Sequence, residues 1–209
     1  MRVYVVDDDP LVRTALELRL EAMGHAPIGF ASALEFLRTA RSLQPGCVIL
    51  DVRMPKIDGL AVQARLKDER LDFPIVMLTG YADVGVAVRA MKAGALDFLE
   101  KPVSEPAISD TLQRAARQLA RGQAQRDNAE SARAALARLT PRERDVFDGL
   151  VAGLRNKAIA RRLGISPRTV ELHRIRVMDK TEVSGLSDLV RLALAAGITA
   201  ATEPLAVGS

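Results

Sequence analysis

The stretch CVILDVRMPKIDG, residues 47–59, carries the clearest signal of fold class in this chain. Its apolar run Cys47–Leu50 is followed by Asp51 and by a turn segment that contains Pro and Gly. A short apolar run bounded by turn residues is typical of a strand buried on both faces of a parallel sheet. Apolar residues then recur at helical spacing over about Leu60–Lys67. The stretch therefore predicts one strand–turn–helix unit.

The same unit recurs on both sides of this stretch. The predicted strands cover Val3–Val6, Ala26–Phe30, Cys47–Leu50, Ile75–Leu78 and Ala95–Leu99. The helices that follow them begin at Pro10, after Ser32, at Leu60, at Val84 and near Pro106. Strands that alternate with helices indicate an α/β fold, here a doubly wound (βα)5 parallel sheet. The functional site of such a fold lies at the carboxyl ends of its strands.

Polar side chains stand at these predicted strand ends. Asp7 and Asp8 follow the first strand, and Asp51 ends the third. Converging carboxylates repel one another unless a cation that prefers oxygen ligands, such as Mg²⁺, binds them. Asp51 is then a candidate nucleophile that forms an aspartyl phosphate, and Thr79 and Lys101 suit the phosphoryl oxygens. Taken singly, each residue has a simpler explanation, such as a helix cap for the Asp run.

Four segments together resemble a known family. They are VVDDD at 5–9, DVRMPKIDG at 51–59, LTGYADV at 78–84 and AGALDFLEKP at 93–102. On these segments, residues 1–121 resemble a response-regulator receiver domain. The resemblance implies that Asp51 accepts a phosphoryl group from a sensor histidine kinase. It also implies that the chain is not an enzyme, beyond promoting its own phosphorylation and dephosphorylation.

The resemblance further implies a cofactor and a switch. Mg²⁺ (or Mn²⁺) would be bound by Asp8, Asp51 and the backbone carbonyl of Arg53, with Asp7 helping through a water.

In the implied switch, Thr79 moves toward the phosphoryl group and Phe98 rotates inward into the space that is left. The Lys101–Pro102 peptide bond is expected to be cis. Arg53 and Tyr81 flank the site and are expected to tune the lifetime of the phosphoryl group.

The net charge of +4 lies entirely in the second part of the chain. Residues 1–122 contain 16 Lys and Arg against 16 Asp and Glu, whereas residues 123–209 contain 14 against 10. Within 138–181 the counts are 11 against 5. A basic excess in one small segment is expected of a nucleic-acid binder. On charge alone, a solvated helix face is an equal alternative.

The second part is predicted to be all helix. Residues 122–136 are expected to form a helical linker, with a partly disordered tether as the alternative. Four helices then begin after Thr140, at Asn156, after Ser166 and at Ser187. Thr140 and Glu143 form a capping box at the first of them. The turn at 164–166 between the second and the third gives a helix-turn-helix signal.

Residues 137–199 resemble a LuxR-type DNA-binding domain, carried by LTPRERDVFDGLVAGLRNKAIARRLGISPRTVELHRIRVMDK. The joint arrangement of the two domains resembles the NarL/FixJ family of response regulators, closest to its FixJ branch. This implies double-stranded DNA, RNA polymerase and, on phosphorylation, a second copy of the chain as partners. Activation of transcription is the expected outcome. Residues 200–209 form a tail with no assigned role.

One face of the third helix in this domain is expected to read DNA in the major groove. Val170, His173, Val177 and Met178 share a stripe that should face the core, so His173 is expected to be a packed histidine. The expected DNA-binding residues are Lys157, Arg168, Thr169, Glu171, Leu172, Arg174, Ile175 and Arg176. Among them the Glu171 carboxylate suits a cytosine amino group, and the two apolar side chains suit thymine methyls. The basic side chains suit phosphates.

Composition excludes several other classes. One cysteine and two histidines supply neither a disulfide framework nor a cysteine- or histidine-rich metal centre. No apolar run approaches the roughly 18–20 residues of a membrane span, and the acidic start of the chain is unlike a signal peptide. A cytoplasmic protein with no membrane partner is therefore expected.

Two other functions remain open. Asp7 and Asp9 have the DxD spacing of haloacid-dehalogenase-type phosphohydrolases, although Asp51 and its companions are then unexplained; turnover of phosphomonoesters would discriminate. The other is a ligand-sensing LuxR-type regulator, which activation by a ligand without phosphate would support. An aromatic content of 3% and an acidic strand edge suggest a poor apolar pocket for such a ligand.

Two modes of regulation also remain open. Phosphorylation is expected to change the surface over roughly Val84–Phe98, through which two receivers would dimerise. Alternatively, the unphosphorylated receiver blocks its own DNA-binding domain and releases it.

Overall fold

The computed structural model describes residues 1–80 and 83–198. Tyr81, the end of the predicted DNA-binding domain at residue 199 and the tail at 200–209 lie outside the described residues. The chain forms two compact units, Met1–Gly122 and a second that begins at Gln123.

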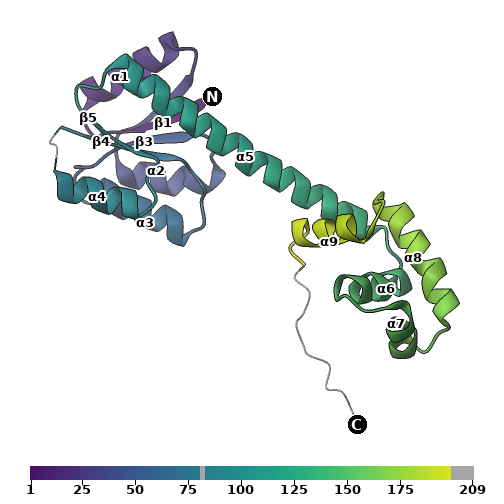
Figure 1. Cartoon of the computed structure of the whole chain (residues 1–209). Coiled ribbons are helices and arrows are strands. Elements are labelled where there is room, and N and C mark those ends of the chain that lie inside the picture. Colours follow the sequence, from purple (N-terminus) through teal and green to yellow (C-terminus); the bar gives the residue numbers. More distant parts are fainter. Residues whose placement is uncertain (81–82, 199–209) are drawn as a thin grey trace. The chain divides into compact units, whose positions relative to one another are not determined.

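The first unit is built on a five-stranded sheet of order β2-β1-β3-β4-β5, in which every pair is parallel (Figure 1). The strands are β1 (Arg2–Val6), β2 (Ala26–Phe30), β3 (Cys47–Asp51), β4 (Ile75–Thr79) and β5 (Asp97–Glu100). β5 begins later than the predicted strand, which started at Ala95. Ala95 still closes the preceding helix, because its N–H donates to the Ala90 carbonyl at 3.0 Å.

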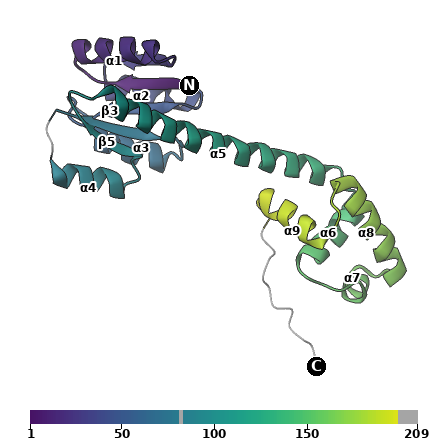
Figure 2. The same ribbon diagram turned by 45° about the horizontal axis from the view of Figure 1, so that its top comes forward.

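Helices cover both faces of this sheet (Figure 2). They are α1 (Pro10–Ala22), α2 (Ala33–Thr39) with a 3-10 turn (Ala40–Ser42), α3 (Gly59–Asp68), α4 (Val84–Lys92) and α5 (Glu105–Ala137). Leu20 of α1 and Leu112 of α5 pack on one face. Phe36, Val62 and Ala90 of α2, α3 and α4 pack on the other. The predicted doubly wound α/β fold is confirmed.

Three carboxylates follow one another after β1, and the third one caps a helix. The side chain of Asp9 accepts from Leu11 N at 2.8 Å and from Val12 N at 3.4 Å, with Pro10 at the first helical position. An N-cap carboxylate satisfies backbone donors that the helix itself leaves unpaired. Asp7 and Asp8 are therefore the two acids of this run that the cap does not use.

An aromatic cluster fills the α2 and α3 side of the core. Tyr4 is fully buried, and its hydroxyl donates to the Gln44 carbonyl at 2.6 Å. Its ring lies 5.9–6.4 Å, between centroids, from the rings of Phe30, Phe36 and Phe73. Such separations are typical of aromatic pairs in protein cores.

α5 is one helix of 33 residues. Ile108, Leu112 and Ala115 are buried in the core of the first unit, and Leu136 belongs to the core of the second. Between them, residues 116–131 contain no buried side chain. The segment 122–136 is thus helical along its whole length.

The second unit consists, within the described residues, of the end of α5 and four further helices. They are α6 (Pro141–Val151), α7 (Asn156–Leu163), α8 (Pro167–Thr181) and α9 (Leu186–Ala195). The predicted capping box is present, since Thr140 N donates to Glu143 Oε2 at 2.8 Å and Glu143 N donates to Thr140 Oγ1 at 3.4 Å. Gly164 ends α7 with a φ of 67°, a left-handed conformation that suits glycine.

Candidate functional site

The carboxyl edge of the sheet gathers three of the predicted site residues around one ammonium. Lys101, just after β5, donates from Nζ to Asp7 Oδ2 and to Asp51 Oδ1, each at 2.6 Å. Asp7 and Asp51 are only 1% and 5% exposed. Chain positions as far apart as 7 and 101 meet here because all the strands run in the same direction.

The backbone fixes the two carboxylates further. Asp51 Oδ2 accepts from Arg53 N at 2.7 Å, and Asp7 Oδ1 accepts from Asp9 N at 3.0 Å. Gly59, the first residue of α3, approaches the Asp51 backbone closely, and a Cβ on it would lie 2.5 Å from the Asp51 carbonyl oxygen. This distance is too short for any side chain, so the position requires glycine.

The electrostatics of the cluster follow from burial and mutual contact. Burial raises the pKa of the Asp51 carboxyl above its ordinary value, because desolvation outweighs the opposing effect of Lys101; the nearby charge of Asp7 adds to the rise. Burial alone would lower the pKa of Lys101. Its hydrogen bonds to the two carboxylates outweigh this effect and raise that pKa. Lys101 is therefore a permanent cation at neutral pH.

Asp8 is exposed, unlike its neighbour Asp7. Together with Arg53, Met54 and Asp58 it lines a cavity of about 530 Å³ at the β3–α3 loop. Within residues 1–80 and 83–198, no three acidic, histidine or cysteine side chains form a ready-made metal-binding group. The predicted donors are carboxylate and carbonyl oxygens, which fit Mg²⁺, an ion that commonly uses one or two carboxylates and completes its shell with water.

Thr79 and Phe98 lie on the adjacent strands β4 and β5. Thr79 is buried, and its carbonyl accepts from Lys101 N at 2.7 Å. Phe98 pairs in register with Met77 and is half-buried against the core on the α4 side of the sheet. The Lys101–Pro102 peptide bond is cis, as predicted.

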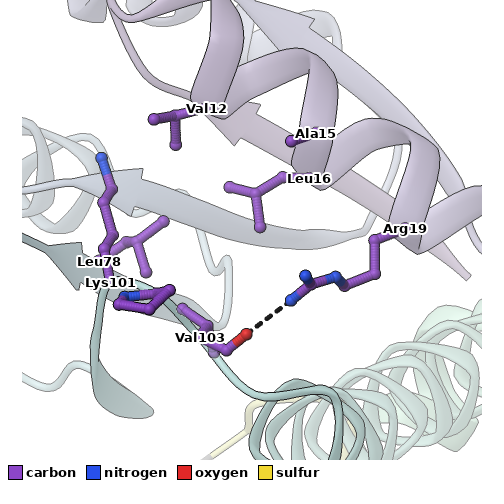
Figure 3. Close-up of a pocket in the computed structure, with 8 residues that line it drawn as sticks. Val12, Ala15, Leu16, Arg19, Leu78, Lys101 and Val103 are labelled. Carbon is purple, nitrogen blue, oxygen red and sulfur yellow. Dashed lines mark hydrogen bonds between the residues drawn. The ribbon is translucent and has the colours of Figure 1, made fainter.

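A second cavity, of about 340 Å³, lies beside the cluster between α1 and the segment after β5 (Figure 3). Its walls include Leu16 and the side chain of Lys101, and Arg19 Nη1 reaches across to the Val103 carbonyl at 2.6 Å. On the same helix, Arg13 Nη1 donates to the Asp7 carbonyl at 2.7 Å. Neither arginine was predicted. Both bind backbone carbonyls, and such contacts leave no sequence pattern.

In the second unit, α8 has a buried inner side and an exposed outer side that carries both polar and apolar residues. Val170 and Val177 are buried and His173 is half-buried, as the predicted stripe required. On the other side, Leu172 and Ile175 are 53% and 60% exposed. Large apolar side chains exposed in this way are suited to contact with a partner.

The other predicted DNA-binding residues surround these two. Lys157, Arg168, Glu171 and Arg176 are exposed, and Arg174 is half-buried. Thr169 belongs to the start of α8, where its hydroxyl lies 2.8 Å from Ser166 Oγ. Ser166 caps α8, because its Oγ accepts from Thr169 N at 3.0 Å.

An ion pair joins α6 to α8. Lys180 Nζ donates to Glu143 Oε2 at 2.6 Å, and Glu143 is buried. Hydrogen bonds from Lys180 and from the backbone of Thr140 lower the pKa of Glu143 to about 2. The capping box was visible in the sequence, but the lysine 37 residues away was not.

Both units match known families. Residues 3–113 match the response regulator receiver domain, and residues 137–193 match the luxR family of bacterial regulatory proteins. The chain belongs to the response regulators of the NarL/FixJ family.

Similar response regulators match over nearly the whole chain. The transcriptional regulatory protein FixJ of Bradyrhizobium diazoefficiens is 44% identical over 94% of this chain and 96% of its own length. FixJ of Rhizobium meliloti is 44% identical over 93% and 96%. The tetrathionate response regulatory protein TtrR of Salmonella typhimurium is 37% identical over 90% of each chain.

Solved structures of response regulators match as well. StyR aligns with a TM-score of 0.77 at 38% identity, over 92% of this chain and 98% of StyR. Full-length FixJ from B. japonicum aligns with a TM-score of 0.58 at 44% identity, over 94% and 97%. This response regulator is thus a two-component transcriptional regulator with a receiver and a LuxR-type DNA-binding domain. No helix in its described part is long and apolar enough to cross a membrane.

Proposed function

We propose that Asp51 accepts a phosphoryl group from a sensor histidine kinase and that this modification controls sequence-specific DNA binding. The observation that carries the proposal is the Lys101 bridge between Asp51 and Asp7. A buried carboxylate at a strand end, beside a fixed cation, is suited to attack on phosphorus. In this proposal residues 1–121 are the receiver, 122–136 the helical linker and 137–199 the DNA-binding domain.

The transfer forms one bond and breaks another. An Asp51 carboxylate oxygen bonds to phosphorus, while the bond from phosphorus to the kinase histidine nitrogen breaks and its electron pair returns to the imidazole. The Lys101 ammonium exchanges its hydrogen bond to Asp51 for one to a phosphoryl oxygen and keeps its bond to Asp7. The Thr79 hydroxyl contacts another phosphoryl oxygen.

Asp8, Asp51 and the Arg53 carbonyl would hold Mg²⁺ (or Mn²⁺), with Asp7 acting through a water. When bound, the cation supplies positive charge that offsets the negative charge of the phosphoryl oxygens. The oxygen-only donor set and the exposure of Asp8 beside the cavity support this assignment.

Thr79 and Phe98 are the proposed switch pair. Thr79 pairs in register with Glu100 and Phe98 with Met77, so the two lie two positions apart on adjacent strands. This proximity supports the proposal that a shift of Thr79 changes the space beside Phe98. α4, on the same side of the sheet, exposes Val84, Val88 and Met91. An exposed apolar stripe suits contact with a second copy of the chain, so dimerisation is the favoured mode and interdomain release the alternative.

α8 is the proposed DNA-reading helix. Leu172 and Ile175 would contact thymine methyls and Glu171 a cytosine amino group, within the major groove. Lys157, Arg168, Arg174 and Arg176 would hold phosphates, as would Thr169 from the helix start. The expected outcome is activation of transcription, with RNA polymerase as a further partner. The protein is expected to act in the cytoplasm.

Light scattering of the full chain, with Mg²⁺ and with or without beryllofluoride, tests this proposal. Beryllofluoride imitates the phosphoryl group on a carboxylate. We expect a Mg²⁺-dependent increase from monomer to dimer that Asp51→Asn abolishes. If beryllofluoride binds but the mass stays that of a monomer, interdomain release replaces dimerisation. If beryllofluoride does not bind, Asp51 is not a phosphoacceptor.

A further inference from the structure

A polar cluster joins the start of β5 to α5, away from the acidic edge. Asp97 is the first residue of β5 and directly precedes Phe98. Its carboxylate accepts from Phe98 N at 2.9 Å through Oδ1. Its Oδ2 accepts from Thr111 Oγ1 at 2.5 Å and from Arg114 Nη2. We call these three residues, Asp97, Thr111 and Arg114, the β5–α5 cluster.

The cluster is sheltered and charge-assisted. Thr111 is only 2% exposed, so its hydroxyl has little access to water as an alternative partner. Arg114 Nη1 also donates to the carbonyl of Leu96, the residue directly before Asp97, at 3.5 Å. Hydrogen bonds between ions are shorter and stronger than those between neutral groups. The start of β5 is therefore held to α5 through the Asp97 side chain and the Leu96 carbonyl.

The cluster connects two elements with different roles. β5 contains Phe98, which directly follows Asp97. α5 continues without a break to Ala137, past the start of the second unit at Gln123. α5 also packs on the first unit through apolar residues such as Ile108 and Leu112. Apolar contacts tolerate sliding, whereas a shared carboxylate constrains direction and distance.

We infer that Asp97 is a positioning residue that couples Phe98 to α5, and this inference rests on the function proposed above. One carboxylate holds both the Phe98 N–H and the α5 side chains. A change in the Phe98 backbone must therefore move Thr111 and Arg114 or break their hydrogen bonds. The cluster thus transmits the state of the switch to the helix that leads into the DNA-binding unit.

The chain offers a matched control. Asp110 is also an ion-pair partner of Arg114, at 3.2 Å from Nε, but it lies on α5 itself, four residues away, and is exposed. Asp110→Asn therefore removes a partner of the same arginine without touching β5. Thr111→Val removes one hydrogen bond to β5, and Asp97→Asn removes the charge and one of the two accepting oxygens. Both substitutions nearly preserve side-chain shape.

The experiment compares these three variants with the unaltered full-length chain. Beryllofluoride occupancy at Asp51 is measured by fluorine NMR in the presence of Mg²⁺. Affinity for DNA is then measured with and without saturating beryllofluoride. The probe is a duplex selected from a random-sequence pool by the beryllofluoride-treated unaltered chain. Thermal unfolding of each variant shows that it is folded at the temperature used.

We expect all three variants to bind beryllofluoride like the unaltered chain. The gain is the ratio of DNA affinity with saturating beryllofluoride to DNA affinity without it. In Thr111→Val and Asp97→Asn this gain should fall at least about fivefold, the lower end of typical coupling between sites. Asp110→Asn should keep the full gain. A role in stability alone would lower the unfolding temperature and leave the gain at saturation unchanged, which would overturn the inference.

Other outcomes also decide against it. Loss of beryllofluoride binding in Thr111→Val would place the cluster in the phosphoacceptor site rather than in coupling. An equal loss of gain in Asp110→Asn would mean that any change around Arg114 suffices. If the unaltered chain itself does not bind beryllofluoride, the proposed function fails, and that failure is separate from a failure of coupling in the variants.

Discussion

Lys101 sets the charge of the acidic edge in the resting receiver. Its single ammonium is shared by two buried carboxylates, those of Asp7 and Asp51. Burial of unpaired charge is unfavourable, which is reflected in the raised pKa of Asp51. The buried Asp51 carboxylate therefore lowers the stability of the fold, as groups in functional sites often do.

Asp51→Asn should for this reason stabilise the first unit near neutral pH. A carboxyl whose pKa is raised in the folded state disfavours folding above that pKa, and the effect disappears below the pKa of the unfolded chain. The thermal midpoint should rise by a few degrees at pH 7, and the gain should vanish as the pH falls to about 4. Thermal unfolding across pH measures this, with the exposed Asp68→Asn as the control. A lower midpoint at pH 7 would contradict the prediction.

Glu143→Gln should have the opposite effect on the second unit. The pKa of Glu143 is lowered to about 2 by Lys180 and the Thr140 backbone. Its stabilising contribution is therefore complete above the unfolded pKa of about 4.5 and is lost as the pH falls toward 2. The free energy of unfolding at pH 7 should fall by about 2 kcal/mol, because a buried charged hydrogen bond is lost.

Urea unfolding followed by circular dichroism measures this loss. Glu182→Gln, which removes an exposed ion pair with Arg138, is the control and should cost less than about 1 kcal/mol. If the two variants lose the same stability, the buried pair contributes no more than a surface one.

The elements themselves were largely predictable from local patterns. Apolar runs such as Cys47–Leu50 identified the strands, because strands buried on both faces have no polar positions. The stripe that contains Val170 and Val177 identified the inner face of α8. The start of β5 was predicted too early because Ala95 is apolar in either state, and only the backbone bond to Ala90 shows that it ends α4.

α8 can be tested through its two exposed apolar residues. Leu172→Ala and Ile175→Ala should leave the unfolding temperature unchanged, since both side chains point to solvent. Each should weaken binding to the selected duplex by about 1–3 kcal/mol, or roughly 5- to 150-fold, through loss of methyl contacts. Leu194→Ala on α9, which is equally exposed, is the control. Equal losses in all three variants would remove the distinction between α8 and the rest of the surface.

α3 depends on the glycine at its first position. In Gly59→Ala the new Cβ would meet the Asp51 carbonyl oxygen at 2.5 Å, so the backbone of Asp51, the proposed phosphoacceptor, must shift. We expect a weaker beryllofluoride affinity, by tenfold or more, because catalytic geometry tolerates little displacement. In Gly80→Ala the Cβ would meet open space, and that variant should bind normally. Normal binding by Gly59→Ala, measured by fluorine NMR, would show that the loop relaxes freely.

At the scale of the whole chain, two compact units share one helix. Contacts between distant residues, such as Lys180 with Glu143 or Arg19 with Val103, were not predictable, because they arise only once the units have folded. The division into units was indicated by the change from alternating strands to helices and by the charge imbalance. The long helix follows from the absence of proline between Pro106 and Pro141.

In limited proteolysis, α5 should be cleaved first. Residues 116–131 of α5 have no buried side chains and include Arg117, Arg121 and Arg126, so this segment opens locally at little cost. Trypsin should cut here before it cuts elsewhere and leave two resistant fragments, identified by mass spectrometry. Initial cleavage at Arg65 or Arg161, which lie on helices of the two units, would contradict this view of the helix.

The burial of Tyr4 has a practical consequence for optical spectroscopy. The chain contains no tryptophan and only two tyrosines, both before residue 122. Ultraviolet emission from tyrosine therefore responds to the receiver and is blind to the DNA-binding domain, whereas circular dichroism sees the helices of both. The substitution Phe147→Trp, inside the core of the second unit, would give that domain a fluorescence signal distinct from that of the tyrosines. The unfolding of each domain could then be followed separately in the intact chain.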